Sequence, residues 1–315
     1  MKKNLSEMIR ESIKQRCLFL NIFLYILYKM NFCNTQIVRN IRYYKIYTKL
    51  RKKYVRYIKT EKKLEKKQIV EKNKNIWIFW YQGMENAPDI VRACYNSIKE
   101  HLNTWNIILI TKENYMEYVN IPEYIIEKLK KNVMTITHFS DILRLALLEK
   151  YGGLWLDATV YCSGNIEIEK LIKNDLFVYR NGWWDNEETI NIESWLIYSD
   201  AHNKIIKDTL KMLYSYWEKE NYLCNYFLMH LFFRISIEEN RKEFEKMPYF
   251  NQIDNHLLQA DLLKKIDYER VEKIKELTDF HKLTYKLNIN TKQDDSLYDY
   301  IIKEQKWKRG NVVEN

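Results

Sequence analysis

The segment FSDILRLALLEKYGGLWLDATV, residues 139–160, constrains the fold more than any other part of the sequence. A helical pattern begins at Ser140, a good N-cap residue, and stops at a glycine pair. The apolar run LWLDATV follows at once and is typical of a buried strand. The chain therefore passes from a helix through a tight turn into a strand, as α/β proteins do.

The same alternation extends on both sides of this segment. Strands are predicted at 75–83, 105–111, 154–160, 176–180 and 194–199, with helices after Pro88 and Pro122 and a mostly helical region from about 202 to 275. Strands separated by helices of this length predict an α/β fold in which a mainly parallel sheet lies between layers of helices.

Charge is divided unevenly along the chain. Residues 1–74 contain 21 Lys or Arg against 5 Asp or Glu, whereas residues 75–315 contain 31 against 37. An acidic body of this kind argues against a nucleic-acid-binding domain, and we expect no nucleic-acid partner. The 5 cysteines are widely spaced and form no CxxC pair, which favours a reducing cytosol over a disulfide framework or a zinc knuckle.

The basic N-terminal arm, residues 1–74, is predicted to be helical and to lie at a membrane surface. Its run CLFLNIFLYILY, residues 17–28, is shorter than the roughly 20 apolar residues that a spanning helix needs. Lys and Arg then alternate with Tyr, Ile, Leu and Val through residues 40–67, a mixture that suits an interfacial helix on anionic lipid. The alternatives are a secretory signal peptide, which lacks the usual small-residue cleavage site, and a basic helix packed on the body.

Three charged residues converge on one predicted strand end. Asp157 closes the apolar run LWL, and the carboxyl ends of strands are where α/β proteins bind ligands. Asp141 and Arg144 are three residues apart on the preceding helix and share a face. This set could hold a metal ion, a polyol or a phosphate. Alternatively, Asp141 is only a charge near the helix start and Arg144 is its salt-bridge partner.

At these residues the sequence resembles a known family. The segment is similar to the SDxxRxxxLxxYGGxYxDxD signature of sugar-nucleotide-dependent glycosyltransferases with a GT-A fold, including family 32 enzymes and the glucosylating clostridial toxins. The nearest likeness is to bacterial capsular polysaccharide synthesis proteins, which share the form GGxWxDAT. NIWIFWYQG and HKLTYK, residues 281–286, resemble flanking motifs of that group. The likeness covers residues 75–290 and leaves 291–315 as a tail.

The resemblance implies a donor site. Trp77 would lie beside the nucleobase, Asp141 and Arg144 would bind the donor sugar, and Asp157 would match the first carboxylate of the DxD motif. That carboxylate holds the ribose and a divalent metal, Mn²⁺ or Mg²⁺, that bridges the diphosphate.

The resemblance also implies a metal ligand and phosphate contacts, with one departure from the pattern. His281 would bind the metal, and Lys282 or Lys286 would reach the phosphates. Where the DxD motif has its second Asp, this chain has Thr159, a weaker ligand for a hard cation. Metal binding is then weak, depends on His281, or is replaced by basic side chains. Without the resemblance, a buried, hydrogen-bonded core histidine is the favoured interpretation of His281.

Candidates for the acceptor side are Trp183, Trp184, Asp254 and His256. The two tryptophans stand in a polar loop after a predicted strand, where exposed indoles suit sugar rings, although ordinary packing explains them as well. Asp254 lies two residues before His256, which begins an HxLQ element that resembles one in the capsule-type proteins.

We therefore expect a retaining glycosyltransferase at the cytoplasmic face of the cell membrane. It would transfer a sugar, from UDP by analogy, to a lipid-linked oligosaccharide or a growing surface glycan. Two alternatives remain: a protein acceptor, as for the toxins, and a non-catalytic scaffold of a glycan-assembly complex, which the Thr159 departure permits.

Overall fold

The computed structural model describes residues 9, 12–13, 17–59, 72–181 and 189–303, and places a five-stranded sheet at its centre. The strands are β1 (Asn75–Phe79), β2 (Asn106–Ile110), β3 (Gly153–Asp157), β5 (Leu176–Arg180) and β6 (Ile192–Ser199). Their order is β2-β1-β3-β6-β5; β1 pairs in parallel with β2 and β3, whereas β6 pairs antiparallel with β3 and β5. The predicted α/β class is confirmed, and the parallel pairing covers one half of the sheet.

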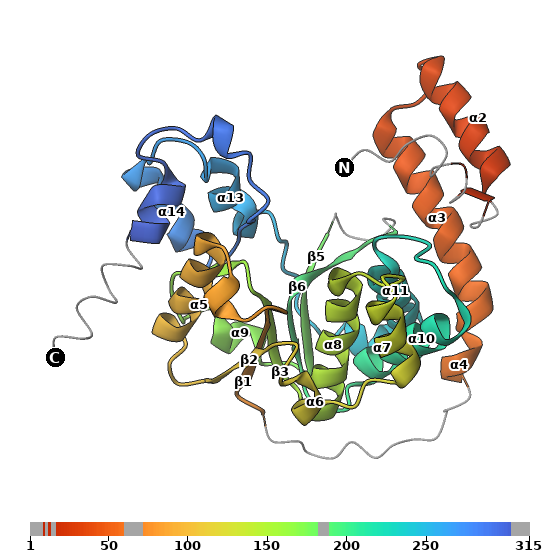
Figure 1. Cartoon of the computed structure of the whole chain (residues 1–315), viewed down its shortest axis with the longest axis horizontal. Helices are drawn as coiled ribbons and strands as arrows, with labels where there is room; N and C mark the ends of the chain where they lie inside the picture. The colour runs from red at the N-terminus through yellow and green to blue at the C-terminus, as the bar shows by residue number, and fades with distance from the viewer. Residues whose placement is uncertain (1–8, 10–11, 14–16, 60–71, 182–188, 304–315) are drawn as a thin grey trace.

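The central strands are apolar between their end residues because both of their faces are covered. Ile76 and Ile78 of β1 and Leu154 and Leu156 of β3 are all fully buried. Continuous apolar runs of this kind are typical of strands that lie between two layers of helices. Figure 1 shows α5 (Asp89–His101) and α9 (Ile168–Leu171) on one side of the sheet.

The other face of the sheet carries the larger layer of helices (Figure 1). These are α7 (Glu123–Lys130), α8 (Ile136–Tyr151), α10 (Lys204–Lys219) and α11 (Leu228–Glu239). The other helices of this part of the chain are α6 (Tyr115–Tyr118), α12 (Arg241–Phe244), α13 (Leu257–Asp261) and α14 (Tyr268–Leu277). A two-stranded antiparallel ribbon, β4 (Val160–Cys162) with β7 (Phe280–Lys282), brings the end of the chain beside the end of β3.

The predicted start of α8 at Ser140 is wrong by about one turn. The helix begins at Ile136, and its N-cap is Thr135, whose hydroxyl accepts a hydrogen bond from the His138 amide. Thr and Ser both cap helices well, so the apolar pattern alone did not separate the two. The glycine exit is confirmed: Gly152 and Gly153 have φ of 68° and 98°, and a Cβ on Gly153 would lie 2.5 Å from the Asn75 carbonyl oxygen.

The N-terminal arm forms a helical hairpin that is partly packed on the body. Its helices are α2 (Leu18–Lys29), α3 (Thr35–Tyr54) and α4 (Arg56–Lys59). In Figure 1, α2 and the first half of α3 stand away from the body, while the end of α3 and α4 lie against it. Within the described residues, no helix combines the length and the apolar character needed to cross a bilayer.

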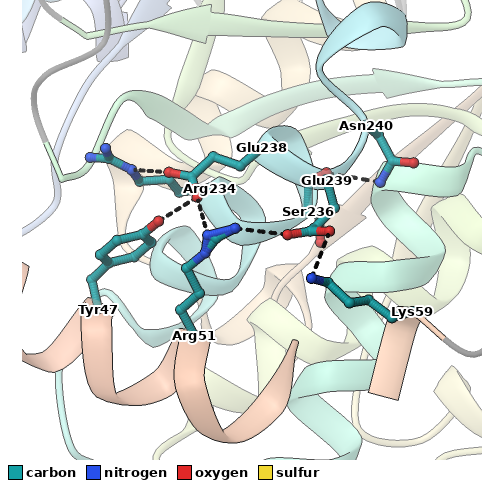
Figure 2. Close-up of polar contacts among 8 residues, drawn as sticks. All are labelled: Tyr47, Arg51, Lys59, Arg234, Ser236, Glu238, Glu239 and Asn240. Carbon is teal, nitrogen blue, oxygen red and sulfur yellow. Dashed lines mark hydrogen bonds and ion pairs between the residues drawn. The ribbon is translucent and has the colours of Figure 1, made fainter. Parts of the chain in front are cut away.

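Polar contacts fasten the second half of α3 to the end of α11 (Figure 2). Arg51 makes ion pairs of 3.1 Å with Glu238 and 2.8 Å with Glu239, and Lys59 lies 3.7 Å from Glu239. The hydroxyl of Tyr47 donates to Glu238. Part of the basic charge of the arm therefore neutralises the acidic end of a body helix.

Candidate active site

Asp157 lies at the carboxyl end of β3, in the middle of the sheet. It is paired in register with Phe79, the last residue of β1. Its side chain is 27% exposed, which makes it the most accessible acidic group of the cluster described below. Trp155, two residues earlier on the same face of the strand, donates a 3.0 Å hydrogen bond from Nε1 to Asp157 Oδ1.

Helix α8 brings Asp141 and Arg144 to this carboxylate. Arg144 Nη2 lies 3.3 Å from Asp141 Oδ1 and 3.4 Å from Asp157 Oδ1, and the guanidinium stacks over the Trp155 ring at 5.0 Å. Arg144 Nη1 also donates to the carbonyl of Ser194 at the start of β6. The predicted convergence is present in the structure, and Arg144 is at once the salt-bridge partner of Asp141 and the link between α8 and β3.

Lys282 completes the cluster from β7. Its Nζ lies 3.6 Å from Asp157 Oδ2 and donates to the hydroxyl of Thr159. The Leu283 amide donates a 2.9 Å hydrogen bond to the Thr159 carbonyl, which fixes this part of the ribbon against the end of β3. A Lys ammonium therefore occupies the space beside the position where a DxD motif would place its second carboxylate.

The two carboxylates of the cluster have opposite pKa shifts. Burial raises the pKa of Asp141 to about 7, an effect that the Arg144 charge opposes and the Asp157 charge reinforces. Burial also acts to raise the pKa of Asp157, but Arg144, Lys282 and the Trp155 hydrogen bond outweigh it and hold the pKa below its usual range. At neutral pH, Asp157 is therefore the carboxylate that carries a full negative charge.

The donor set does not fit a divalent cation held by protein ligands. Both oxygens of Asp157 face cationic side chains, and the Thr159 hydroxyl already accepts from Lys282. Among the described residues, no group of three His, Cys, Asp or Glu side chains is arranged to hold a metal ion. Hard cations such as Mg²⁺ and Mn²⁺ prefer several oxygen ligands, and one shared carboxylate falls short of that.

His281 does not join the cluster, although it is the neighbour of Lys282. Successive residues of a strand point to opposite faces, so Lys282 faces Asp157 while His281 faces away. His281 is fully buried and its Nε2 lies 2.9 Å from the hydroxyl of Ser163. Burial, with a smaller effect of the Lys275 charge, lowers its pKa to about 3. The geometry is that of a neutral core histidine.

Trp77 lies in the core and not at the edge of the sheet. It is 1% exposed, its Nε1 donates a 2.9 Å hydrogen bond to the Gly152 carbonyl, and its ring packs against Tyr118 and Tyr151. No face of this ring is open for a nucleobase. Trp80, which directly follows β1 at the carboxyl edge, is half-buried and contacts Tyr285 edge to face at 5.4 Å.

The remaining predicted residues lie around the cluster or outside the described chain. Lys286 is exposed, with its ammonium 5.8 Å from the Tyr285 ring. Asp254 is exposed at the start of the short helix η2 (Asp254–His256). His256 packs edge to face against Trp195 at 6.2 Å. Trp183 and Trp184 are outside the described residues.

A chain of hydrogen-bonded side chains beside the cluster links His256 to Glu193, and this chain was not predicted from the sequence. His256 Nε2 lies 2.6 Å from Gln252 Oε1, Gln252 Nε2 donates to Asn181 Oδ1 at 2.5 Å, and Asn181 Nδ2 donates to Glu193 Oε1 at 2.7 Å. Burial raises the pKa of Glu193, an effect that the Asn181 hydrogen bond and the Lys282 charge oppose and the Asp157 charge reinforces. Glu193 is the second residue of β6, and only the antiparallel direction of β6 brings it to this edge.

The structure thus gathers one partly exposed carboxylate, a Lys ammonium and a buried guanidinium at the carboxyl edge of a mixed α/β sheet. A family model described as "Capsular polysaccharide synthesis protein" matches residues 27–301, and the chain belongs to this family. The matched range starts within the arm and ends beyond residue 290, so the family unit includes α3, α4 and part of the tail. This finding confirms the predicted kinship with capsular polysaccharide synthesis proteins.

Curated relatives and a solved structure were also found. The O-glycosyltransferase braB of Annulohypoxylon truncatum is 29% identical over 113 residues, 33% of this chain and 27% of the relative. The O-glycosyltransferase PaGT of Phomopsis amygdali is 30% identical over 96 residues, 28% of this chain and 24% of the relative. The matches thus span about a quarter of these relatives. The PaToxG glycosyltransferase structure is 17% identical, with a TM-score of 0.39, over 76% of this chain and 94% of that chain.

Proposed function

We propose that this protein is a nucleotide-sugar-dependent glycosyltransferase that adds a sugar to a lipid-linked or growing surface glycan. The observation that carries the proposal is the union of Asp157, Arg144 and Lys282 at the carboxyl edge of β3. Membership of the capsular polysaccharide synthesis family and similarity to two O-glycosyltransferases support it.

Accessibility divides the cluster into a binding layer and a supporting layer. The side chains of Asp157 and Lys282 are 27% and 20% exposed, whereas those of Asp141 and Arg144 are 9% and 5% exposed. Asp157 accepts hydrogen bonds from ribose or sugar hydroxyls, and Lys282 binds the diphosphate. Arg144 contacts Asp157 from the buried side of the cluster and holds it in place. It also adds positive charge where the leaving diphosphate becomes more negative.

The nucleobase is assigned to Trp80. This ring stands at the carboxyl edge of β1, on the strand next to β3, with Tyr285 at its side. An aromatic face at this position stacks with any base, so it contributes affinity and does not select the nucleotide. UDP remains the favoured nucleotide by family analogy.

The proposed reaction is front-face transfer with retention of anomeric configuration. A bond forms between the acceptor oxygen and the anomeric carbon while the bond from that carbon to the diphosphate oxygen breaks. The proton of the acceptor hydroxyl passes to the departing diphosphate oxygen. Lys282 stabilises that oxygen by electrostatic interaction and hydrogen bonding, which is the main contribution of the protein to such transfers. The site of action is the cytoplasmic face of the cell membrane, where a lipid-linked acceptor is reached.

Calorimetric titration of the full chain with UDP- and GDP-sugars tests the proposal. We expect one donor class to bind, and Asp157→Asn to weaken binding about 10- to 100-fold because charged hydrogen bonds to hydroxyls are lost. Asp254→Asn, which changes an exposed carboxylate of η2, serves as the matched control. Because Thr159 stands in place of the second carboxylate and the Lys282 ammonium lies beside it, we expect binding to persist in EDTA. Absence of binding to any donor, or equal binding by Asp157→Asn, contradicts the proposal.

A further inference from the structure

Helix α2 turns its apolar face away from the protein. Phe19, Ile22, Phe23, Ile26 and Met30 follow helical spacing along α2 and its C-cap, and they are 88%, 49%, 57%, 48% and 60% exposed. Leu24, on the opposite face, is 2% exposed where α2 packs on α3. A surface helix of a soluble protein normally has the reverse arrangement, with its apolar stripe directed toward the core.

Exposed apolar residues also follow α2 along the chain. Phe32 in the connecting turn is 72% exposed, and Ile37, Ile41 and Tyr44 of α3 are 45%, 39% and 55% exposed. We call these four residues and the five of the α2 stripe the hairpin face. Nine exposed apolar residues within one hairpin are typical of an interaction site, because single exposed apolar residues are ordinary whereas a clustered set is not.

Charge identifies the partner of the hairpin face. Residues 17–59 contain 10 Lys or Arg and no Asp or Glu. Lys29, Arg39 and Lys45 are exposed beside the apolar residues. Cations that border an apolar, aromatic surface are complementary to an anionic lipid bilayer. A second copy of the chain would instead bring two cationic hairpins together at a cost in Coulomb energy.

The dimensions of α2 favour a position in the plane of the membrane interface. A helix of 12 residues is about 18 Å long, against about 30 Å for the hydrocarbon core. Tyr25 and Tyr28, which are 56% and 41% exposed, lie on α2 outside the stripe, and exposed tyrosines are frequent at the level of lipid headgroups. Both features match an interfacial amphipathic helix.

The hairpin is joined to the candidate active site through the start of α11. The rings of Tyr43 on α3 and Phe227 are 5.8 Å apart. The neighbouring Tyr226 accepts through its carbonyl at 3.1 Å from His138 Nε2, at the start of α8. Burial raises the pKa of Tyr226, and the Asp141 and Asp157 charges reinforce that rise. A short series of contacts therefore links α3 to the start of α8, the helix that carries Asp141 and Arg144.

We propose that the hairpin face binds the surface of an anionic bilayer, lying in the interface, and holds the active site next to the membrane. The contacts in Figure 2 fix the second half of α3 to the body, so that the hairpin, once bound to a membrane, would keep the body close to the lipid surface. This proposal does not depend on which donor or acceptor the protein uses, because it concerns only the surface to which the protein binds.

Flotation of the full chain with vesicles tests the proposal. Phosphatidylcholine vesicles with and without 30% phosphatidylglycerol are compared at low and high salt. We expect binding to anionic vesicles only, with a loss of at least about tenfold for Phe19→Gln/Phe23→Gln, since two large apolar rings no longer enter the lipid. We expect a smaller loss for Arg39→Gln/Lys45→Gln, which salt reproduces for the wild type.

The matched control replaces two exposed apolar residues of the body, Met116→Gln/Ile166→Gln, which are 68% and 75% exposed. This variant binds vesicles as the wild type does. All variants alter exposed side chains and are checked for an unchanged thermal midpoint. Equal vesicle binding by the Phe19→Gln/Phe23→Gln variant overturns the proposal. Failure of the wild type to bind anionic vesicles also overturns the proposal. If, in that case, sedimentation shows a dimer and the Phe19→Gln/Phe23→Gln variant is monomeric, the face binds a second copy of the chain.

Discussion

Asp157 is accessible and charged because a buried strand ends at it. The strand supplies a fixed backbone, Trp155 and Arg144 hold the carboxylate from one side, and Lys282 approaches from the other. The identity of each of these residues is readable in the sequence. What the sequence does not contain is the pairing of β4 with β7, which brings residue 282 to residue 157 and turns residue 281 away.

Lys282 and Lys286 provide a test of that pairing. Lys282→Met removes the ammonium beside Asp157, and we expect kcat/KM to fall about 100-fold because leaving-group charge loses its partner. Lys286→Met removes an exposed ammonium next to Tyr285, and we expect less than about a threefold change, as for a surface charge. Steady-state kinetics decide, and equal losses in the two variants would show that Lys282 has no special position.

Substitutions of Trp77 in β1 and of Trp80 directly after β1 are expected to have different effects on stability and on donor binding. Trp77→Leu leaves a cavity in the core and costs about 3 kcal/mol in the free energy of unfolding, with the donor Kd of the folded protein unchanged. Trp80→Leu weakens donor binding about tenfold through lost stacking and has little effect on unfolding. Urea unfolding and calorimetry measure both quantities. Reversed effects would return the nucleobase to Trp77.

Asp141 makes stability depend on pH. Its pKa is about 7 in the folded protein, against about 3.9 for an unfolded Asp. The folded state therefore binds the extra proton, and the resulting stability is complete below pH about 4 and is lost as pH rises through about 7. We expect wild type to lose stability relative to Asp141→Asn between pH 5 and 8. Parallel pH curves for the two proteins would contradict the shift.

At the scale of elements, the predicted strands and helices are present because periodicity and turn residues specify them locally. The antiparallel direction of β6 was not predicted, since no local pattern states which way a buried strand runs in a sheet. That direction places Glu193, and not the far end of β6, beside the cluster. The start of α8 was misplaced because Thr135 and Ser140 both satisfy the rules for an N-cap.

Apolar packing, more than ion pairing, is expected to hold α3 on the body. Tyr54 is 1% exposed and contacts the rings of Tyr216 and Phe232, so Tyr54→Ala should cost about 3 kcal/mol in the free energy of unfolding. Arg51→Ala should lower the free energy of unfolding by less than about 1 kcal/mol, because the Arg51 side chain is 36% exposed. Urea titrations of both variants compare the two costs, and a larger loss for Arg51→Ala would show that the ion pairs dominate.

At the scale of the whole molecule, the arm and the body are packed together and share one hydrophobic core. The body presents the Asp157 cluster at one edge of its sheet, and the arm, whose α3 is packed on the body, presents exposed apolar and cationic residues. Composition alone separates the basic arm from the acidic body. Packing then joins them, since Tyr47, Leu50 and Tyr54 of the arm are buried in the same core as the sheet. A lipid-linked acceptor would meet both parts at once.

Glycosyl transfer from a nucleotide sugar is tested most directly by measuring, with NMR, donor turnover by the full chain. We predict that, without an acceptor, the wild type slowly hydrolyses one nucleotide sugar and releases a nucleoside diphosphate, with the sugar first appearing in its original anomeric configuration. Asp157→Asn should lose this activity and Asp254→Asn should keep it. Absence of turnover with every donor would favour a scaffold, and release of the opposite anomer would contradict retention.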